Sequence, residues 1–213
     1  MGLLFHLRTE DQPEPSPERR RLLDSALRTF AARGYDRASL KQIATEASVT
    51  AAMVNYYFGS KEKLFAHVID ACYRRLGAIV EQRAHASLSF EERLRGFVNA
   101  HVEFCKAAPA EAELLVRTAF RLDDALGPES AERYEPLREL AHEIFTVAVS
   151  HGELTLRRSL DARRAAEWLL GQVELTVIRL VQDRRVPGAG VPSFTTEETV
   201  DLFLRGVDAT RAR

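Results

Sequence analysis

The chain of 213 residues is poor in cysteine, glycine and proline, and it has no long apolar run. Cys72 and Cys105 are its only cysteines and form no CxxC pair, so neither a disulfide framework nor a zinc motif is expected, and a reducing cytoplasm is the expected location. Eleven glycines and eight prolines exclude a collagen-like or linker-dominated chain. Without a run of about 18 apolar residues, no membrane-spanning helix is expected.

An excess of charge of one sign is also missing, since 30 basic and 31 acidic residues leave a net charge of -1. DNA-binding proteins usually carry a basic excess, so the total argues against a DNA partner. The distribution argues the other way. Residues 17–63 hold nine basic and five acidic residues, a net of +4, and the rest of the chain carries -5. A basic DNA-binding segment on an acidic body would have this asymmetry.

Strict two-residue alternation, the mark of a β-strand, is absent as well, and apolar residues recur at helical spacing instead. We therefore expect an all-α fold. Residues 1–16, with Pro13 and Pro15 among polar residues, are expected to form a disordered tail. Ser16 and Pro17 then predict the N-cap and first position of a helix that Gly34 ends.

Similar local signals predict the later helices. Capping boxes are expected at Ser39 with Gln42, at Ser89 with Glu92 and at Thr195 with Glu198. Other boundaries rest on single residues: Thr50 and Ser60 as N-caps, Pro109 and Pro136 near helix starts, Gly152 at an end, and Ser159 or Asp161 before a long helix. Residues 186–193 are expected to form an irregular loop.

Two of the expected helices are short, one starting after Ser39 and one running from Thr50 to about Tyr56. Such helices are marginal alone, so they require packing on the longer first helix. Two short helices joined by a tight turn indicate a helix-turn-helix at about 39–58, inside a three-helix domain of residues 17–63.

The second short helix and its exit read TAAMVNYYFGSK, with no charge between Thr50 and Ser60. Ala51 and Ala52 would let the helix approach a groove closely, and Asn55 can pair with an adenine edge. Tyrosine hydroxyls and a lysine at a helix N-terminus suit phosphates. The candidate DNA-binding residues are Ser39, Lys41, Thr50, Ala51, Ala52, Asn55, Tyr56, Tyr57 and Lys61.

Several of these residues also fit other roles. Phe58 is expected in the core, and Tyr56 fits the core or a DNA contact equally. Asn55 could contact a base or only the DNA backbone. Of Met53 and Val54, one is expected to contact DNA and the other to lie in the core. Arg19, Arg20 and Arg21 suit either phosphate contact or a solvated helix start.

At these residues the sequence resembles the TetR family of transcriptional regulators. The shared pattern is Phe30-Ala31-x-x-Gly34-Tyr35, then Ser39-Leu40-x-x-Ile43-Ala44-x-x-Ala47-x-Val49, then Tyr56-Tyr57-Phe58-x-Ser60-Lys61-Glu62-x-Leu64. The resemblance covers about residues 17–70, a third of the chain. It departs at Ala51-Ala52-Met53, where many members carry Gly-Thr or a similar small polar pair.

The resemblance implies a homodimeric regulator, a ligand-released repressor that binds a palindromic double-stranded DNA operator. Residues 64–213 would form a larger helical domain for ligand binding and dimerisation, without a cofactor, a metal or catalysis. Its last two long helices, about 160–183 and 196–210, would pair with their copies across the dimer. An unknown small-molecule effector would occupy a pocket for which the candidate residues are His101, Cys105, Phe120, Phe145, Trp168 and Gln172.

Plainer interpretations remain open for the larger domain. His101 and Cys105 share a helix face, which suits a core pair or half of a metal site. Glu139 and His142 form a single Glu-x-x-His, whereas a di-iron bundle needs two. Two rival functions also remain: a protein-interaction adaptor whose helix-turn-helix no longer reads DNA, and a helical-bundle enzyme. The uncharged Ala51-Ala52 segment keeps the adaptor possible.

Overall fold

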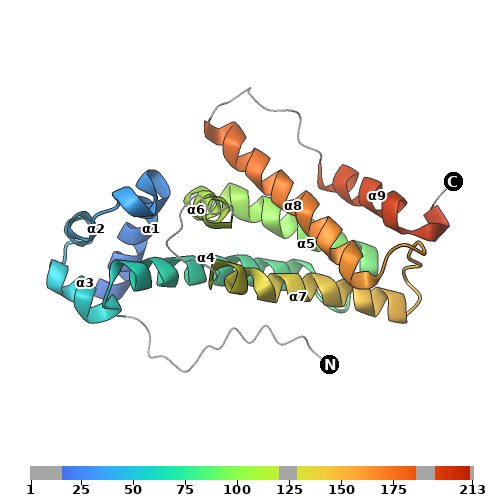
Figure 1. The fold of residues 1–213 in the computed structure, drawn as a ribbon, viewed down its shortest axis with the longest axis horizontal. Coiled ribbons are helices and arrows are strands. Elements are labelled where there is room, and N and C mark those ends of the chain that lie inside the picture. The colour runs from blue at the N-terminus through green and yellow to red at the C-terminus, as the bar shows by residue number, and fades with distance from the viewer. Residues whose placement is uncertain (1–15, 120–128, 186–194, 212–213) are drawn as a thin grey trace. The chain divides into compact units, whose positions relative to one another are not determined.

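The computed structural model describes residues 16–119, 129–185 and 195–211. Within these residues the chain forms nine α-helices and a short 3₁₀ helix without a β-strand, which confirms the all-α prediction (Figure 1). The helices are α1 (Pro17–Arg37), α2 (Leu40–Glu46), α3 (Ala51–Phe58), α4 (Lys61–Arg83), α5 (Phe90–Ala107), α6 (Pro109–Ala119), α7 (Glu129–Ser150), α8 (Ala162–Arg185), α9 (Thr196–Val207) and η2 (Ala209–Arg211).

Most helix starts lie where the local signals predict them. The Ser16 hydroxyl accepts from the Arg19 amide at 3.3 Å, and the Thr50 hydroxyl accepts from the Met53 amide at 3.4 Å. Both oxygens satisfy amides that a first helical turn leaves unpaired. The structure also confirms side-chain capping by Ser60 and the capping boxes at Ser89 and Thr195.

Two boundary predictions were wrong in detail. Ser39 is the N-cap of α2, but its side chain makes no capping hydrogen bond, and the Gln42 amide donates to Glu46 at 2.8 Å instead. The predicted capping box is therefore absent, because Gln42 finds a carboxylate one turn later. Pro136 lies inside α7, which begins seven residues earlier at Glu129. Of the two candidates before α8, Asp161 is the cap, accepting from the Arg164 amide at 2.8 Å.

Some predictions fall outside the described residues. They are the disordered tail before Ser16, the irregular loop at 186–193, and Phe120 as a pocket residue.

The sequence predicts that Gly34 ends the first helix, whereas in the structure it interrupts α1, which continues to Arg37. The glycine's φ of 74° and ψ of 172° are non-helical, and the chain then makes one further turn through Arg37. This backbone region is essentially restricted to glycine, because a side chain there would clash with the backbone. The last residues of α1 therefore leave the line of the main helix.

The described chain divides into two compact units. We call residues 16–75 with 108–133 the head unit, and residues 76–107 with 134–211 the body unit, in each case where described. Helices α4 and α7 contribute residues to both. This division differs from the expected boundary after residue 63, because α6 packs against α1 and so joins the head unit. The functional boundary at residue 63 remains a prediction.

The head unit is built on a core that α1 shares with α2, α3 and the first half of α4. Phe30 meets Phe65 edge-on, with ring centroids 4.9 Å apart, and Tyr35 lies 5.1 Å from Phe65. Aromatic pairs at such distances add to the stabilisation that burial supplies. The other buried side chains here include Leu22, Ala26, Ile43, Val54, Phe58, Leu64 and Ile69.

In the body unit, α5 packs against α8 and α9. Phe145 of α7 contacts Phe90 and Phe203, with ring centroids 5.4 and 5.7 Å away, and Trp168 of α8 lies 5.2 Å from Phe203. The segment before α8 also holds the end of α9, because the Ala209 amide donates to the Thr155 carbonyl at 2.8 Å. Aromatic packing and this backbone bond fix α9 at its middle and at its end.

Gly96 of α5 permits a close approach between two helices of the body unit. A Cβ at this position would lie 1.9 Å from the Arg83 carbonyl oxygen at the end of α4. We expect Gly96→Ala to lower the free energy of unfolding by about 1–3 kcal/mol, because the backbone must move. Urea unfolding followed by circular dichroism measures this. Gly171→Ala is the control, since its Cβ would meet nothing within 4 Å. Equal stability of both variants would contradict the prediction.

Candidate nucleic-acid interface

Helix α2 is fastened to α1 by side chains that take up its last carbonyl groups. The Ser25 hydroxyl donates to the Ile43 carbonyl at 3.0 Å, and Arg21 Nε donates to the Ala47 carbonyl at 3.2 Å. A helix end leaves such carbonyls unpaired, so these bonds supply partners that the seven-residue helix lacks. The Glu46 carboxylate accepts hydrogen bonds from Gln42, Thr29 and Ser25, which hold its pKa below the usual value.

The turn between α2 and α3 is tight and partly buried. Ser48 has a φ of 56°, a left-handed value that is uncommon outside glycine, and the Val49 amide donates to the Ala44 carbonyl at 3.0 Å. Ala47 is buried beneath the turn. The angle between the two short helices is therefore set by hydrogen bonds and packing, as a helix-turn-helix requires.

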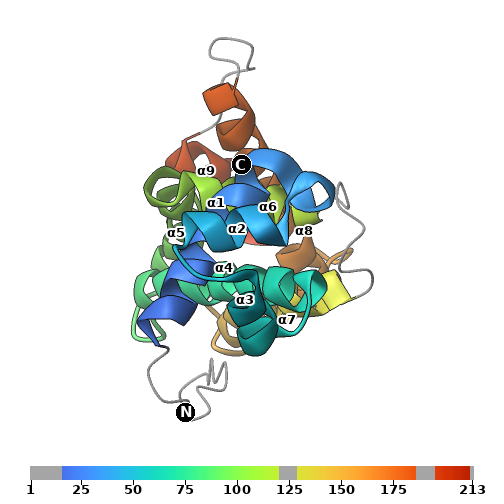
Figure 2. The same ribbon diagram turned by 90° about the vertical axis from the view of Figure 1, so that its left-hand side faces the viewer.

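Helix α3 has one buried and one exposed face. Figure 2 shows α2 and α3 on the side turned toward the viewer. Val54 and Phe58, four residues apart, lie in the core, as predicted for Phe58. Met53, which the sequence pattern offers as the alternative to Val54 for the core position, is half-buried. Tyr56 is 83% exposed, which excludes the core alternative for it. The exposed face consists of Ala51, Ala52, Asn55 and Tyr56.

The other predicted contact residues also reach the surface of the head unit. Ser39, Lys41 and Thr50 are exposed, and Tyr57 and Lys61 are partly exposed. The structure adds Thr45, which is exposed one turn after Lys41 and donates its hydroxyl proton to the Lys41 carbonyl at 2.9 Å. Sequence reasoning missed Thr45, although its spacing of four residues from Lys41 was a usable signal.

Tyr57 is held by the start of α1. The Ser16 hydroxyl donates to the Tyr57 phenolic oxygen at 3.0 Å, and the Arg19 guanidinium lies 5.4 Å from the centre of the Phe58 ring. Both contacts join the first turn of α1 to the end of α3 across about 40 residues of sequence. Ser16 therefore both caps α1 and positions a candidate phosphate-binding hydroxyl.

Lys61 at the start of α4 turns toward the end of α1. Its ammonium lies 4.3 Å from the centre of the Tyr35 ring and donates to the Asp36 carbonyl at 3.3 Å. The adjacent Glu62 accepts a hydrogen bond from the Tyr35 hydroxyl at 2.7 Å. That bond is the main cause that lowers the pKa of Glu62 to about 2, and burial together with Glu62 raises the pKa of Tyr35.

The described candidates for an effector pocket all lie in the body unit. Phe145 is buried and Trp168 is 44% exposed, and both contact Phe203. Gln172 lies one turn after Trp168 on α8 and is half-buried. Cys105 is buried, and burial raises its thiol pKa to about 11. These residues therefore belong to one packed unit, and their role in ligand binding remains a prediction.

His101 is the most unusual of these candidates. Its side chain is fully buried, and burial lowers the imidazole pKa to about 4, so the ring is neutral near pH 7. Nδ1 lies 2.8 Å from the Phe97 carbonyl, and Nε2 has no hydrogen-bond partner among the described residues. A buried polar atom without a partner costs free energy, so Nε2 is suited to meet a polar atom of a bound molecule.

Among the described residues, no group of three potential metal-ligating side chains comes together. In the same part of the chain, no helix has the length and apolarity needed to cross a membrane.

The comparisons with known proteins agree with this architecture. Residues 22–68, from α1 into α4, match the family described as bacterial regulatory proteins, tetR family. The HTH-type transcriptional regulator BetI of Brucella anthropi is 42% identical over 188 residues, covering 88% of this chain and 94% of the relative. The chain belongs to the TetR family.

Solved structures show the same TetR-family fold. The fatty acid degradation regulator FadR from Bacillus halodurans superimposes with a TM-score of 0.75 at 21% identity, covering 88% of this chain and 98% of that one. FadR from Bacillus subtilis, solved in complex with stearoyl-CoA, gives 0.74 at 18% identity over the same shares. As a TetR-family member the protein is a DNA-binding transcriptional regulator, and the adaptor and bundle-enzyme alternatives are not favoured.

The Tyr35–Glu62 hydrogen bond predicts a pH dependence of stability. The pKa of Glu62 is about 2 in the folded chain and about 4.3 when unfolded. The ionised carboxylate therefore favours folding above pH 4.3, and this contribution is lost as the pH falls toward 2. We expect the difference in melting temperature between wild type and Glu62→Gln to shrink between pH 6.5 and pH 3.

Asp24→Asn is the control for this prediction, because Asp24 is an exposed acid on α1. Its difference from wild type should change little over the same range. A Glu62→Gln difference that stayed constant with pH would contradict the assigned hydrogen bond.

Proposed function

We propose that the protein is a homodimeric repressor. It holds its two copies of α3 in successive major grooves of a palindromic operator, and an effector releases it from the DNA. The observation that carries the proposal is the exposed, uncharged face of α3, formed by Ala51, Ala52, Asn55 and Tyr56. Small side chains allow the helix backbone to come close to base edges, and the asparagine amide can bond an adenine.

The residues around this face are suited to hold the DNA backbone. Thr50 and Tyr57 offer hydroxyls at the two ends of α3, and Lys41 lies exposed on α2. Phosphate contacts of this kind fix the register of the reading helix without reading sequence. Lys61 can join them as well, because its ammonium uses one N–H donor for the Asp36 carbonyl and has two more.

Operator binding by Asn55→Ala tests the reading role of α3. We expect a loss of about 1–3 kcal/mol on the operator and relaxed preference at one base pair, because a bidentate contact to a base is removed. Fluorescence anisotropy with the DNA upstream of the protein's own gene, run across a salt series, measures both. An equal loss on operator and random DNA would exclude base reading by Asn55.

Lys61→Ala is the matched comparison, because a phosphate contact carries no sequence information. It should weaken binding on every sequence alike and lower the salt slope by about 1. An unchanged slope would remove Lys61 from the phosphate contacts. No binding by the wild type at low salt would contradict the repressor proposal as a whole.

The effector is proposed to bind in the body unit, with His101, Cys105, Phe145, Trp168 and Gln172 as candidate residues. The buried apolar residues around the neutral His101 Nε2 support a mainly apolar molecule that carries one hydrogen-bonding group. The FadR neighbour from Bacillus subtilis was solved with stearoyl-CoA, which has a long apolar chain. An effector of this kind releases DNA when it binds the non-operator state more tightly.

The dimer is proposed to form through α8 and α9. Trp168, Leu175 and Leu202 are large apolar residues of these helices, with 44%, 41% and 55% of their surface exposed. Large apolar side chains gathered on two neighbouring helices favour a second protein surface over water. A two-fold axis would bring the same two helices of a second copy against them, which gives a four-helix interface.

The variant Leu175→Asp/Leu202→Asp tests this interface. Two buried, unpaired carboxylates would oppose association, so we expect the mass to fall to the 24.0 kDa of one chain. Size-exclusion chromatography with light scattering gives the mass, and circular dichroism checks the helix content. Val149→Asp is the control, because Val149 is 40% exposed on α7. A variant that remained dimeric would place the interface elsewhere.

A further inference from the structure

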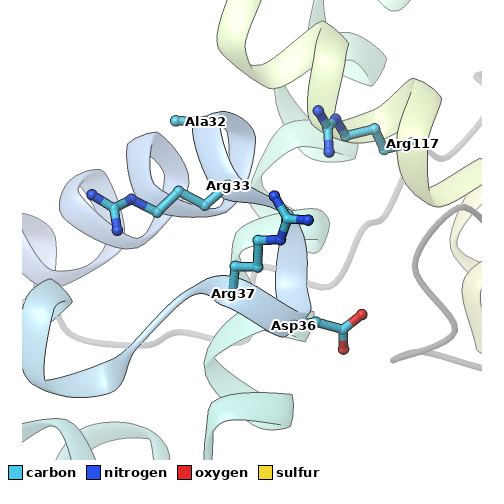
Figure 3. Close-up of a pocket in the computed structure, with 6 residues that line it drawn as sticks. Ala32, Arg33, Asp36, Arg37 and Arg117 are labelled. Carbon is cyan, nitrogen blue, oxygen red and sulfur yellow. The ribbon is translucent and has the colours of Figure 1, made fainter.

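The head unit contains a hollow of about 560 Å³ beside the kink in α1 (Figure 3). Its lining consists of Ala32, Arg33, Gly34, Asp36, Arg37 and Arg117. Three of these residues are arginines and one is acidic, so the lining carries an excess of positive charge. The DNA-binding role described above does not use any of the three arginines.

The kink at Gly34 explains how the arginines come together. Because the chain leaves the line of α1 at this glycine, Arg37 lies across the hollow from Arg117 of α6. Figure 3 shows the guanidinium groups of Arg37 and Arg117 directed toward each other. The Arg33 side chain extends along α1 away from this pair, and the Asp36 carboxylate also points away from it.

Within the described residues, Glu113 is the one carboxylate that forms an ion pair with an arginine of the hollow. Among the described residues, no carboxylate forms an ion pair with Arg33 or Arg37. Arg117 Nε lies 3.4 Å from Glu113 Oε1 on the preceding turn of α6, but it makes no hydrogen bond within the described part of the chain. Two guanidinium groups that face each other repel, and an anion between them would be attracted by both.

We propose that this hollow binds a small phosphorylated anion, with Arg37 and Arg117 as its two clamps and Arg33 at its rim. Each guanidinium offers parallel N–H donors that match two phosphate oxygens, and one phosphate can accept from two arginines at once. A volume of about 560 Å³ admits a diphosphate and its water. The ligand class is therefore a diphosphate or a small molecule that carries one.

Such an anion would connect two elements that already pack together. Arg37 ends α1 and Arg117 lies on α6, and both helices belong to the head unit. A bridging phosphate would brace α1 against α6, and α1 is the helix that holds α2 and the end of α3. The site would thus link an anionic metabolite to the rigidity of the DNA-binding part, in addition to the effector proposed for the body unit.

Isothermal titration calorimetry of the full chain with pyrophosphate tests the proposal in the absence of DNA. We expect saturable binding of one anion per chain and a rise in melting temperature that chloride at the same ionic strength does not give. In Arg37→Gln and in Arg117→Gln the dissociation constant should rise at least about tenfold, because charge-assisted hydrogen bonds are lost. Arg33→Gln should have a smaller effect.

Arg74→Gln is the matched control, since Arg74 is an exposed arginine of α4 in the same unit. Its binding should equal that of the wild type. Equal binding in all variants, or heat that tracks ionic strength alone, would overturn the site. Absence of pyrophosphate binding, with loss of DNA affinity in Arg117→Gln, would assign the pair to the DNA backbone and also overturn it. Binding that is lost in Arg37→Gln supports the site even where the operator experiments fail.

Discussion

Helices of seven and eight residues are not stable alone in water, and the surface proposed to read DNA is built from two of them. They persist because Ile43, Val54 and Phe58 are buried against longer helices. That packing is non-directional, so hydrogen bonds from α1 to the last carbonyls of α2, and from Ser16 to Tyr57 near the end of α3, add the directional contacts. Every other property of the interface, including the outward face of α3, depends on α1 as the common support.

Side chains of α1 and its N-cap form hydrogen bonds with all three helices that follow, α2, α3 and α4. Arg21 and Ser25 hold the end of α2, and Ser16 holds Tyr57 at the end of α3. Tyr35 meets the first turn of α4 through Glu62. Because these residues lie from the first to the last turn of α1, the positions of the next three helices are coupled to one another. A disturbance at either end of α1 therefore changes how the recognition helix is presented.

Signals within a few residues of each other predicted most of the fold, since caps such as Thr50 and Thr195 act on the turn that follows them. The capping box at Ser39 failed because the Gln42 side chain can bond either the Ser39 backbone amide or the Glu46 carboxylate, and sequence alone does not rank these two partners. Contacts between residues far apart in the sequence could not be predicted from local signals. The partner of Lys61 is Tyr35, and Arg117 meets α1 across some 80 residues, so neither the turned lysine nor the cationic hollow had a local signature. The exposed fraction of Tyr56 placed it on the outer face of α3, whereas the sequence had fitted the core and a DNA contact equally.

The kink at Gly34 also bears on how this sequence can change over time. A backbone with φ 74° and ψ 172° accepts glycine alone, yet the residue carries no side chain to contact DNA, effector or partner. Substitution there would move Arg37, Tyr35 and the start of α4 together. In a set of diverging descendants we therefore expect this glycine to persist while the exposed residues of α3 drift with the operator. The position that varies least would then be one that offers no side chain to any ligand.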